Sequence, residues 1–562
     1  KKKKKNKTKS RKTINNTNRI EIGSSNLAED PSIGIFNNNI NGTVNNSSDI
    51  ISGKNSINIY NKGGQINHLL GNIEVGEKGT GIYTSSGSVK LTSGTLNLNG
   101  IAAVGVYGTN NAIIDINAKI NVSQESYGMV LIGESDLTNR DVSTLADKGV
   151  LLYSDGNVNV KNEYGANINV AGSNSIGFYM KNGGTLVNKA EIIGNSGIGN
   201  IGIYNKSGNI DNSGNIKIGN SLIIDPQNPF VNEYAVGIYG DGVKNIKNTG
   251  NIEVGANAVG FYITGNLNEA LNTGNISSDS EKAIGIYSEQ GAVRNTGNIT
   301  LSGDGSIGIA AARNSKISNS GTITMNGNEN IGIYAHSNSQ IINESTGKIY
   351  INGNNSIGVQ LSGGSVLENY GLIEVTAGTI GSMQIVTGDP AYTPPSIINA
   401  GVIKVDEKFE LDGLNLIIKP DPESFRAPTM EEIIKNEYAL EDINAGFLLS
   451  NKVNIAAPSF DFGNNTVGID PLFTQGTNAR VYKFENVFDP TTPEGGPNTG
   501  KVAVKSGSLT FDAIPVTNDK GKIDIWMEKI NYNEFTQGSW QNEFAGNIEG
   551  NYLNATGDAL KL

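Results

Sequence analysis

The feature that most constrains this chain is a pentapeptide of the form Ser/Ala-Ile-Gly-Ile-Tyr, which recurs fifteen times with substitutions. Between the first copy, Ser32–Phe36, and the last, Thr379–Met383, all steps but one measure 23 to 26 residues, and the remaining step measures 35 residues. A period this regular indicates an array of similar supersecondary units. Ankyrin and tetratricopeptide repeats need a longer helical period, and the Leu-x-x-Leu-x-Leu frame of leucine-rich repeats is absent.

Each repeat contains a second motif, Asn-Ser/Thr-Gly-x-Ile, as in Asn248–Ile252 and Asn295–Ile299. The unit 283–304 divides into three short segments that alternate apolar with small or polar residues, which is typical of strands with one buried face. Three strands cannot bury that face alone, so successive units must stack. We expect the motif asparagines to form a ladder, each amide bonding to the backbone of the next coil. In the unit 283–304 we expect Gly285 and Tyr287 to point outward and the following residues inward: Ile284, Ile286, Val293, Ile299 and Leu301.

The sequence therefore predicts an all-β fold, a parallel β-helix with three strands per coil and about 15 coils of 23–26 residues. Changes in sequence pattern divide the chain into a basic N-terminal segment expected to be disordered (1–29), the repeat array (30–405), a β-rich cap (406–532) and a linker (533–562). One short helix is expected in the cap, because Thr429 begins a capping pattern that leads to Ile443.

Charge and residue usage exclude several functional classes. The net charge is −11, and the first twelve residues contain nine basic side chains, so the remainder carries −11 − 9 = −20. An acidic body argues against a nucleic-acid partner. With no cysteine and only His68 and His336, zinc and thiol chemistry are excluded, and we expect no metal site and no cofactor. No run of 18 apolar residues is present that could span a bilayer as a helix.

Catalysis is not expected. Polysaccharide-cleaving β-helices are the main enzymatic alternative, and they use carboxylates clustered on adjacent coils. The acidic residues that follow the second motif, Glu74, Glu253 and Glu374, fall on distant coils. The sequence therefore predicts a binding protein without catalytic residues, with such an enzyme or a purely structural stalk as alternatives.

Interruptions of the array are the first candidates for recognition, because binding residues concentrate in loops held by a rigid scaffold. The 35-residue step contains the insertion Ser221–Glu233, a second excursion is Gln384–Ser396, and Leu131–Lys148 keeps the repeat length but loses the second motif. For each of these segments, a decoration without a binding role is the alternative. The candidate ligand-binding residues are Asp225, Pro226, Pro229, Phe230, Asp389, Tyr392, Glu134, Asp136 and Arg140.

A stripe of aromatic residues is a second candidate, because the pentapeptide usually ends in tyrosine. Exposed aromatic rings stack on sugars and anchor protein interfaces. The alternative is that neighbouring rings stack on each other and stabilise the coils. The candidate exposed stripe contains Tyr204, Tyr239, Tyr262 and Tyr287.

With these motifs identified, the chain resembles the passenger region of large fusobacterial type V (monomeric) autotransporter adhesins. The resemblance rests on the alternation of Ser/Ala-Ile-Gly-Ile-Tyr with Asn-Thr-Gly-Asn-Ile and on the terminal segments Gly538–Phe544 and Glu549–Tyr552. The resemblance implies a right-handed parallel β-helix. It implies a monomer displayed on the bacterial surface, with 406–532 as a folding-nucleation region and 533–562 leading to an outer-membrane barrel that this chain lacks. It further implies host-cell receptors or glycans and other bacterial cells as partners, in virulence, coaggregation and biofilm formation.

Overall fold

The computed structural model describes residues 12–265, 268–376, 378–379, 393–411, 413–474, 477–492 and 502–555. Contacts between Cα atoms divide the chain into two compact units, Lys1–Gly303 and Asp304–Leu562. Both units contain parallel β-solenoid coils, and the second also contains a β-rich C-terminal region. The predicted all-β parallel solenoid is therefore confirmed.

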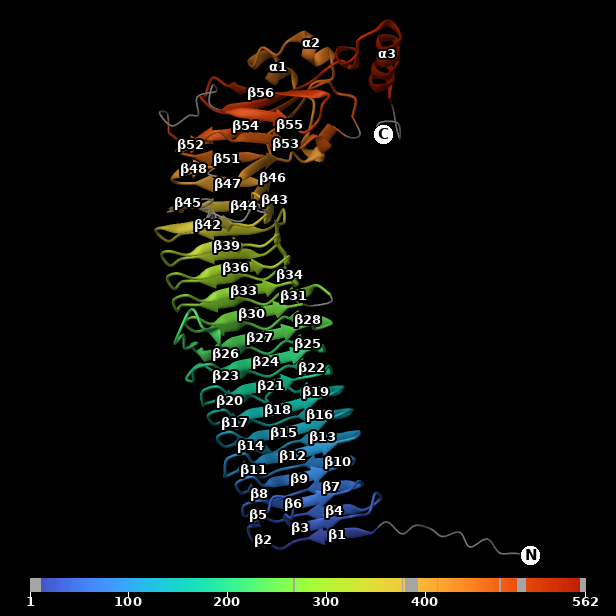
Figure 1. Cartoon of the computed structure of the whole chain (residues 1–562), viewed down its shortest axis with the longest axis vertical. Helices are drawn as coiled ribbons and strands as arrows, with labels where there is room; N and C mark the ends of the chain where they lie inside the picture. Colours follow the sequence, from blue (N-terminus) through green and yellow to red (C-terminus); the bar gives the residue numbers. More distant parts are fainter. Residues whose placement is uncertain are drawn as a thin grey trace, which may run out of the picture. The chain divides into compact units, whose positions relative to one another are not determined.

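Each coil of the first unit contributes one strand to each of three parallel sheets (Figure 1). The pentapeptide sheet contains β3 (Ser32–Asn37), β6 (Ser56–Asn61), β9 (Thr80–Thr84), β12 (Val104–Thr109), β15 (Tyr127–Ile132), β18 (Val150–Asp155), β21 (Ile176–Met180), β24 (Ile201–Lys206), β27 (Val236–Asp241), β30 (Val259–Thr264) and β33 (Ile284–Glu289). The asparagine sheet contains β1 (Thr13–Asn16), β4 (Thr43–Asn46), β7 (Gln65–His68), β10 (Gly87–Leu91), β13 (Ala112–Ile116), β16 (Ser135–Asn139), β19 (Val158–Asn162), β22 (Thr185–Asn188), β25 (Asn209–Asn212), β28 (Asn245–Asn248), β31 (Ala270–Asn272) and β34 (Ala292–Asn295). The third sheet contains β2 (Ile20–Ile22), β5 (Ile50–Ser52), β8 (Asn72–Val75), β11 (Thr95–Leu98), β14 (Lys119–Val122), β17 (Ser143–Leu145), β20 (Ile168–Val170), β23 (Ile192–Gly194), β26 (Ile216–Ile218), β29 (Ile252–Val254), β32 (Ile276–Ser278) and β35 (Ile299–Leu301).

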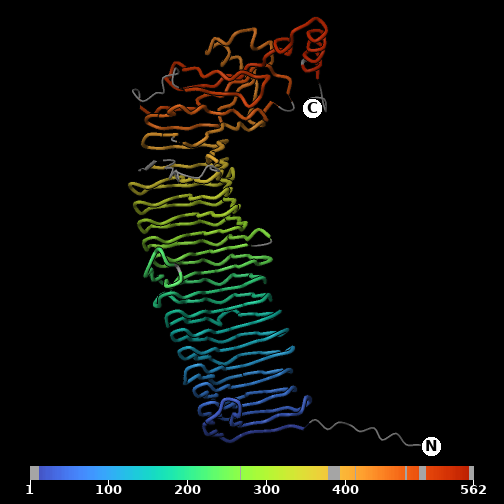
Figure 2. Tube along the Cα trace, viewed as in Figure 1, coloured from blue at the N-terminus to red at the C-terminus, as the bar shows by residue number. Residues whose placement is uncertain are grey.

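Neighbouring coils pair in register, so equivalent residues of successive repeats lie directly above one another (Figure 2). In the core, Val89 pairs with Ile66 and Leu96 with Ile73. Ile66, Ile73 and Leu96 have no exposed surface. The apolar positions of the repeat therefore form continuous buried columns, as a strand pattern with one buried face requires.

The pentapeptide strand departs from simple alternation. In β33 the second and third residues, Gly285 and Ile286, are both buried, whereas Ile284 and Tyr287 are half-buried. The expectations that Gly285 points outward and Ile284 inward are wrong. A Cβ at the equivalent Gly260 would lie 2.6 Å from the Cγ2 of Ile276 on the facing sheet. A side chain there would require the facing residue to shift, and other coils make this room, because the same position holds the buried Asn58 in β6 and the buried Leu151 in β18.

The asparagine ladder is present, but its hydrogen bonds differ from those expected. The Nδ2 of Asn212 donates to the Oδ1 of Asn248 at 2.7 Å and to the carbonyl oxygen of Gly214, in its own turn, at 2.8 Å. The Nδ2 of Asn248 repeats the pattern with Asn272 and Gly250. Each amide thus bonds mainly to the next side chain and to its own turn. This arrangement satisfies polar groups that are fully buried at the corner of the coil.

The coils begin before residue 30. β1 pairs with β4, with Thr13 opposite Thr43, and β2 pairs with β5, with Ile20 opposite Ile50. Residues 13–16 and 20–22 of the segment expected to be disordered are therefore strands. The boundaries at 30, 406 and 533 were drawn from sequence pattern and stay predictions.

The second unit contains further coils of the same three kinds. Its pentapeptide strands are β36 (Ile307–Ala312), β39 (Ile331–Ala335), β42 (Ser356–Leu361) and β45 (Gly378–Thr379). Its asparagine-sheet strands are β37 (Lys316–Asn319), β40 (Gln340–Asn343), β43 (Val366–Asn369), β46 (Ser396–Asn399), β49 (Asn415–Ile418), β53 (Thr466–Ile469) and β55 (Ala503–Ser506). Its third-sheet strands that pair in parallel along the coils are β38 (Thr322–Met325), β41 (Lys348–Ile351), β44 (Leu372–Val375), β47 (Val402–Val405) and β51 (Asn454–Ala457).

In the cap, the pairing changes from parallel to antiparallel. β54 (Val481–Pro490) pairs in parallel with β50 (Leu448–Ser450) and β51, but antiparallel with β57 (Ile523–Lys529). β57 in turn pairs antiparallel with β56 (Phe511–Thr517). A separate parallel pair is formed by β48 (Lys408–Glu410) and β52 (Ser459–Asp461). Short 3-10 turns are η2 (Pro422–Ser424), η3 (Pro471–Thr474) and η5 (Tyr532–Phe535), and η1 (Pro229–Val231) lies in the first unit.

The predicted capping pattern is correct, but the predicted single helix is two helices, α1 (Met430–Lys435) and α2 (Leu440–Asn444). Thr429 and Glu432 form a capping box. Glu437 then adopts a positive φ of 51°, and the ring of Tyr438 packs 4.9 Å from that of Phe447. Packing of this tyrosine into the cap ends the first helix.

A third helix, α3 (Ser539–Asn554), lies within the segment expected to be a linker. The Lys529 side chain, which has no exposed surface, donates to the Oε2 of Glu549 at 2.6 Å. The hydroxyl of Tyr552 donates to the carbonyl oxygen of Ala479 at 2.8 Å. The helix is therefore docked on the cap through a buried ion pair. Among the residues that the structure describes, no helix is long and apolar enough to cross a membrane.

The first prediction concerns the ladder. Asn248→Ala removes the acceptor of Asn212 and the donor to the Oδ1 of Asn272, and it should lower the free energy of unfolding by about 1–3 kcal/mol. Urea denaturation followed by circular dichroism measures the change. Asn169→Ala, at an exposed position of β20, is the matched control and should change stability by less than about 0.5 kcal/mol. Equal effects of the two substitutions would contradict the structural role of the ladder.

The second prediction concerns His68, which occupies a ladder position, with its Nδ1 2.8 Å from the Nδ2 of Asn46. Burial lowers the pKa of its imidazole, against a hydrogen bond to Gly71 and the charge of Asp49, which raise it. As the pH falls, the imidazole of His68 is therefore protonated in the unfolded chain before it is protonated in the folded chain. The free energy of unfolding decreases below about pH 6.5, by at most about 1.4 kcal/mol per pH unit. His68→Asn should remove this part of the pH dependence in urea denaturation between pH 7 and 5. His336→Asn should leave it intact, and an unchanged profile in His68→Asn would refute the prediction.

Candidate recognition surface

The insertion Ser221–Glu233 is a folded loop organised by one residue, Asn232. The Oδ1 of Asn232 accepts from the backbone N–H groups of Ile224 and Asp225 at 2.8 and 3.0 Å. Its Nδ2 donates to the carbonyl oxygen of Asp225 and the hydroxyl of Tyr234, both at 3.0 Å. An antiparallel bridge between Leu222 and Glu233 closes the base of the loop. Sequence reasoning missed Asn232, because asparagine is abundant throughout the chain.

This loop presents an apolar tip. The side chain of Phe230 is 96% exposed, and Ile224 is 61% exposed. Asp225 is structural, because its Oδ1 accepts from the backbone N–H of Gln227 and so holds the turn that contains Pro226. Pro229 begins the 3-10 turn η1 that carries Phe230. Pro226 and Phe230 are both exposed, and Phe230 presents the larger apolar side chain to solvent.

The second predicted group, from Leu131–Lys148, is part of a regular coil formed by β15, β16 and β17. Asp136 lies exposed on β16 and accepts from the Nδ2 of Asn159 at 3.0 Å. Arg140 follows the strand and donates through its Nε to the Oδ1 of Asp115 at 2.9 Å. Glu134 is exposed in the turn before β16. Glu134 and Asp136 line the same hollow of the asparagine sheet.

The third predicted group, Asp389 and Tyr392, lies outside the described residues.

The aromatic stripe is present, and its rings contact each other. Ring centroids of Tyr239 and Tyr262 are 4.5 Å apart and stacked, whereas Tyr204 and Tyr287 meet their neighbours edge to face at 5.0 and 4.8 Å. All four residues are half-buried. The stacking fits the alternative that the stripe stabilises the coils. Ligand binding by the stripe stays a prediction.

Burial and neighbouring charge affect the ionisation of Tyr204 in the stripe. Burial, with smaller contributions from the Asp241 carboxylate and neighbouring rings, raises the pKa of Tyr204. Its hydroxyl donates to the Oδ2 of Asp241 at 3.3 Å, and Lys206 pairs with the same carboxylate at 3.3 Å. The Tyr204 phenol is therefore held in its protonated form and donates its hydrogen bond to Asp241.

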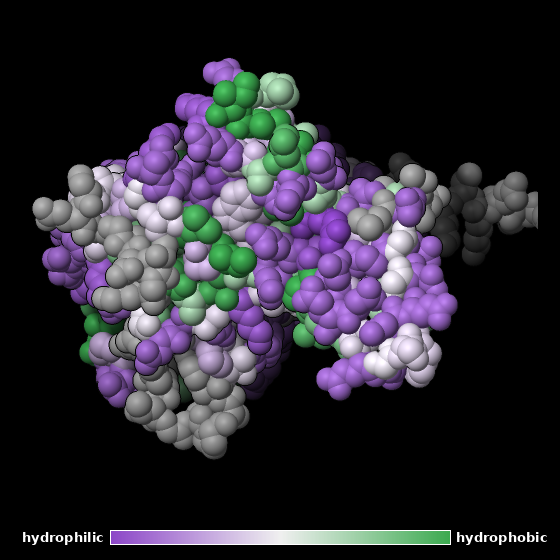
Figure 3. Space-filling model, turned by 90° about the horizontal axis from the view of Figure 1, so that it is seen from above, coloured by the Kyte–Doolittle hydropathy of each residue, from purple (hydrophilic) through white to green (hydrophobic). Residues whose placement is uncertain are grey.

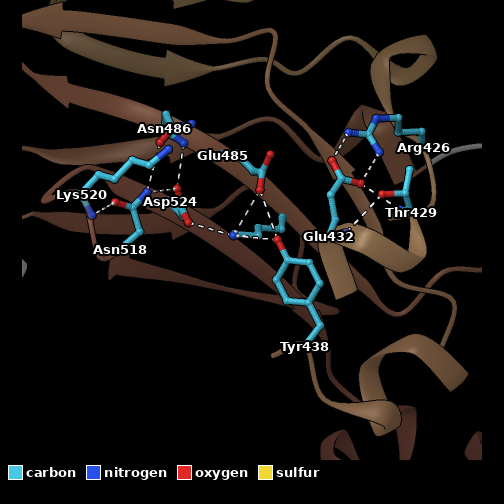
Figure 4. A network of polar contacts seen from close by, with 10 residues as sticks. Arg426, Thr429, Glu432, Tyr438, Glu485, Asn486, Asn518, Lys520 and Asp524 are labelled. Carbon is cyan, nitrogen blue, oxygen red and sulfur yellow. Dashed lines mark hydrogen bonds and ion pairs between the residues drawn. The ribbon is translucent and has the colours of Figure 1, made fainter. Parts of the chain in front are cut away.

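A hollow of about 490 Å³ lies in the cap between the α1–α2 connection and the strands β54, β56 and β57. Among its lining residues, the Nζ of Lys483 lies 3.0 Å from the Oδ2 of Asp524 and donates to the hydroxyl of Tyr438 at 3.1 Å. Both of these partners are labelled in Figure 4. Burial disfavours the charge of Lys483, but Asp524 and Tyr438 outweigh it and raise its pKa. The Oδ1 of Asp524 accepts from the backbone N–H of Asn486 and from Asn518. Because these groups satisfy one another, the network stabilises the cap.

Exposed apolar side chains also occur on the cap helices. Met430, Ile434 and Leu440 are 70%, 72% and 74% exposed. Figure 3 shows small apolar areas separated by hydrophilic ones on the face it views. Scattered apolar residues of this kind are normal on folded proteins.

In the part of the chain that the structure describes, no group of three or more His, Cys, Asp or Glu residues could hold a metal ion.

One comparison with known families matches part of the cap. Residues 442–531 match a family model described as the BigA beta sandwich domain. In the structure this range runs from α2 through β57 and contains the change from parallel to antiparallel pairing. The match and the β-solenoid fit a passenger-like domain and suggest a surface protein of adhesin type. No curated protein matches the chain.

The third prediction tests the organisation of the loop. Asn232→Ala removes both acceptor and donor contacts, so the amides of Ile224 and Asp225 should exchange hydrogen faster and the loop should be cut sooner by proteases. Hydrogen exchange followed by mass spectrometry measures this effect, and the global stability should change little. Gln227→Ala, at an exposed position of the same loop, is the control. Unchanged protection in Asn232→Ala would show that the loop is held in another way.

Proposed function

We propose that this chain is the passenger of a cell-surface adhesin, displayed by an autotransporter of the fusobacterial type V class and binding without catalysis. In this proposal the coils form a scaffold, and residues that interrupt them contact the target cell. The partners are host-cell receptors or glycans and the surfaces of other bacteria, which would link the protein to coaggregation, biofilm formation and virulence. The full-length protein would be anchored in the outer membrane.

The observation that carries this proposal is the exposure of Phe230 on a preorganised loop. An aromatic side chain that is 96% exposed costs free energy in water, and its loop is held by four hydrogen bonds from and to Asn232. Preorganisation lowers the entropy lost on binding. Exposed aromatic anchors are the residues that contribute most at interfaces.

Two further observations support an adhesin. The match at residues 442–531 is to a domain of bacterial adhesin type. The acidic body argues against nucleic acid as a target, and a repetitive scaffold with one inserted loop suits contact with another surface.

The fourth prediction tests the contact directly. Phe230→Ala should lower the apparent affinity of the purified chain for host epithelial cells or partner bacteria at least tenfold, because truncating a central aromatic anchor costs about 2 kcal/mol or more. Flow cytometry with labelled protein measures the binding. Leu70→Ala, which removes a side chain that is 59% exposed elsewhere in the first unit, is the matched control and should bind as the parent does. Unchanged binding of Phe230→Ala to every cell type would exclude this loop as the adhesive contact.

A further inference from the structure

Three hollows on the outer face of the asparagine sheet, all in the first unit, lie next to one another in a row, which we term the groove. The first, of about 320 Å³, is lined by residues of β4, β7, β10 and β13 and includes Ile40 and Ile113. The second, of about 210 Å³, also contains Ile113 and extends to Asp136 and Asn159. The third, of about 390 Å³, contains the same Asp136 and Asn159 and extends to β22. Because neighbouring hollows share lining residues, they follow one another along successive coils, with Ile113 between the first two and Asp136 and Asn159 between the last two.

One residue from each coil lines this groove in register with its neighbours. The pairing runs from β4 through β7, β10, β13, β16 and β19 to β22. Adjacent strands are about 4.8 Å apart, so six steps span about 29 Å. The residues of this column are Thr43, Gln65, Ser88, Ile113, Asp136, Asn159 and Thr185.

The chemistry of the column suits a ligand rich in hydroxyl groups. Hydroxyl, amide and carboxylate side chains occupy all its positions except Ile113, which is 56% exposed. Ile40 adds a second apolar side chain, 62% exposed, at the same hollow. Asn159 donates to Asp136 at 3.0 Å, which orients both side chains on the face. Such sites combine apolar contact with a few placed polar groups.

The dimensions and charge indicate a chain-like, neutral ligand. A sugar unit in an extended glycan advances by about 5 Å, close to the strand spacing of about 4.8 Å. The hollows, of about 210 to 390 Å³, lie at or below the lower end of the range for compact-ligand pockets, whereas a linear chain would occupy all three. The charged lining residues are Glu134, Asp136 and Lys161, with a formal sum of 1 − 2 = −1. This small negative charge disfavours acidic polysaccharides.

We propose that this groove binds a linear, neutral glycan that lies along the stack of coils with about one sugar per coil. The inference rests on the proposed adhesin function and names a ligand class for it. It involves residues 40–187, whereas the loop contact depends on Phe230, so the two can fail separately. Asp136 and Glu134, which the sequence singles out as loop residues, act here as part of a sheet surface.

The test is calorimetric titration of the purified chain with neutral β-1,4-linked gluco- and N-acetylglucosamine oligosaccharides of one to eight units. The affinity of at least one series should rise with length and level off near six or seven units, as the strand spacing requires. The double substitution Asp136→Ala/Asn159→Ala should lower it at least tenfold. Asp136→Asn, which keeps an oxygen acceptor for Asn159, should lower it less.

The matched control is Asn97→Ala/Asn121→Ala, which removes a similar asparagine pair, 2.7 Å apart, from the outer face of the third sheet. Its affinity should equal that of the parent. Three binding results would overturn the inference: no binding of any neutral oligosaccharide, an equal loss in the control, or tighter binding of polyuronates than of neutral chains. Release of reducing ends would overturn it in favour of a cleaving enzyme. Loss of cell binding in Phe230→Ala without any oligosaccharide binding would leave the adhesin standing and exclude the groove.

Discussion

The structure depends on in-register parallel hydrogen bonding between successive coils. A strand spacing of about 4.8 Å places each residue directly above its equivalent in the previous repeat. Residues at the same position of successive repeats are therefore aligned along the unit. Tyr239 of β27 and Tyr262 of β30 stack because both occupy the last position of the pentapeptide. The same constraint makes substitutions costly, because every buried side chain must fit two neighbours as well as its own coil.

Two buried features fix the cross-section of the coil. The asparagine ladder satisfies backbone groups at one corner through bonds such as that from Asn248 to Gly250 and to Asn272. At the pentapeptide, glycine faces the core, because a Cβ at Gly260 would meet Ile276 on the facing sheet. In the Ile-Gly-Ile-Tyr motif, the glycine thus lies against the facing sheet, and the tyrosine joins the outer stack of rings. Because these roles are structural, functional residues are expected outside these two motifs, in loops and at outward-facing positions of the coils.

The molecule offers two kinds of such places. The loop around Asn232 departs from the repeat and presents Phe230, whereas the groove through Asp136 and Asn159 uses the repeat itself. In the groove, a regular scaffold becomes a recognition surface because outward-facing positions vary from coil to coil while the register stays constant. The cap has a different role, since its antiparallel strands and the buried Lys529–Glu549 pair close the second unit and dock α3.

The sequence alone determined the three-stranded coil, the asparagine ladder, the capping box at Thr429 and the place of the insertion that contains Phe230, because each depends on local spacing or on a pattern repeated many times. Tertiary structure decided the rest. Gly285 is buried because of the distance to the facing sheet, and α1 ends early because Tyr438 packs on Phe447. Asp136 and Asn159, 23 residues apart in the chain, become one hydrogen-bonded surface only when their coils stack. Such contacts depend on three-dimensional distances that a repeat pattern does not contain.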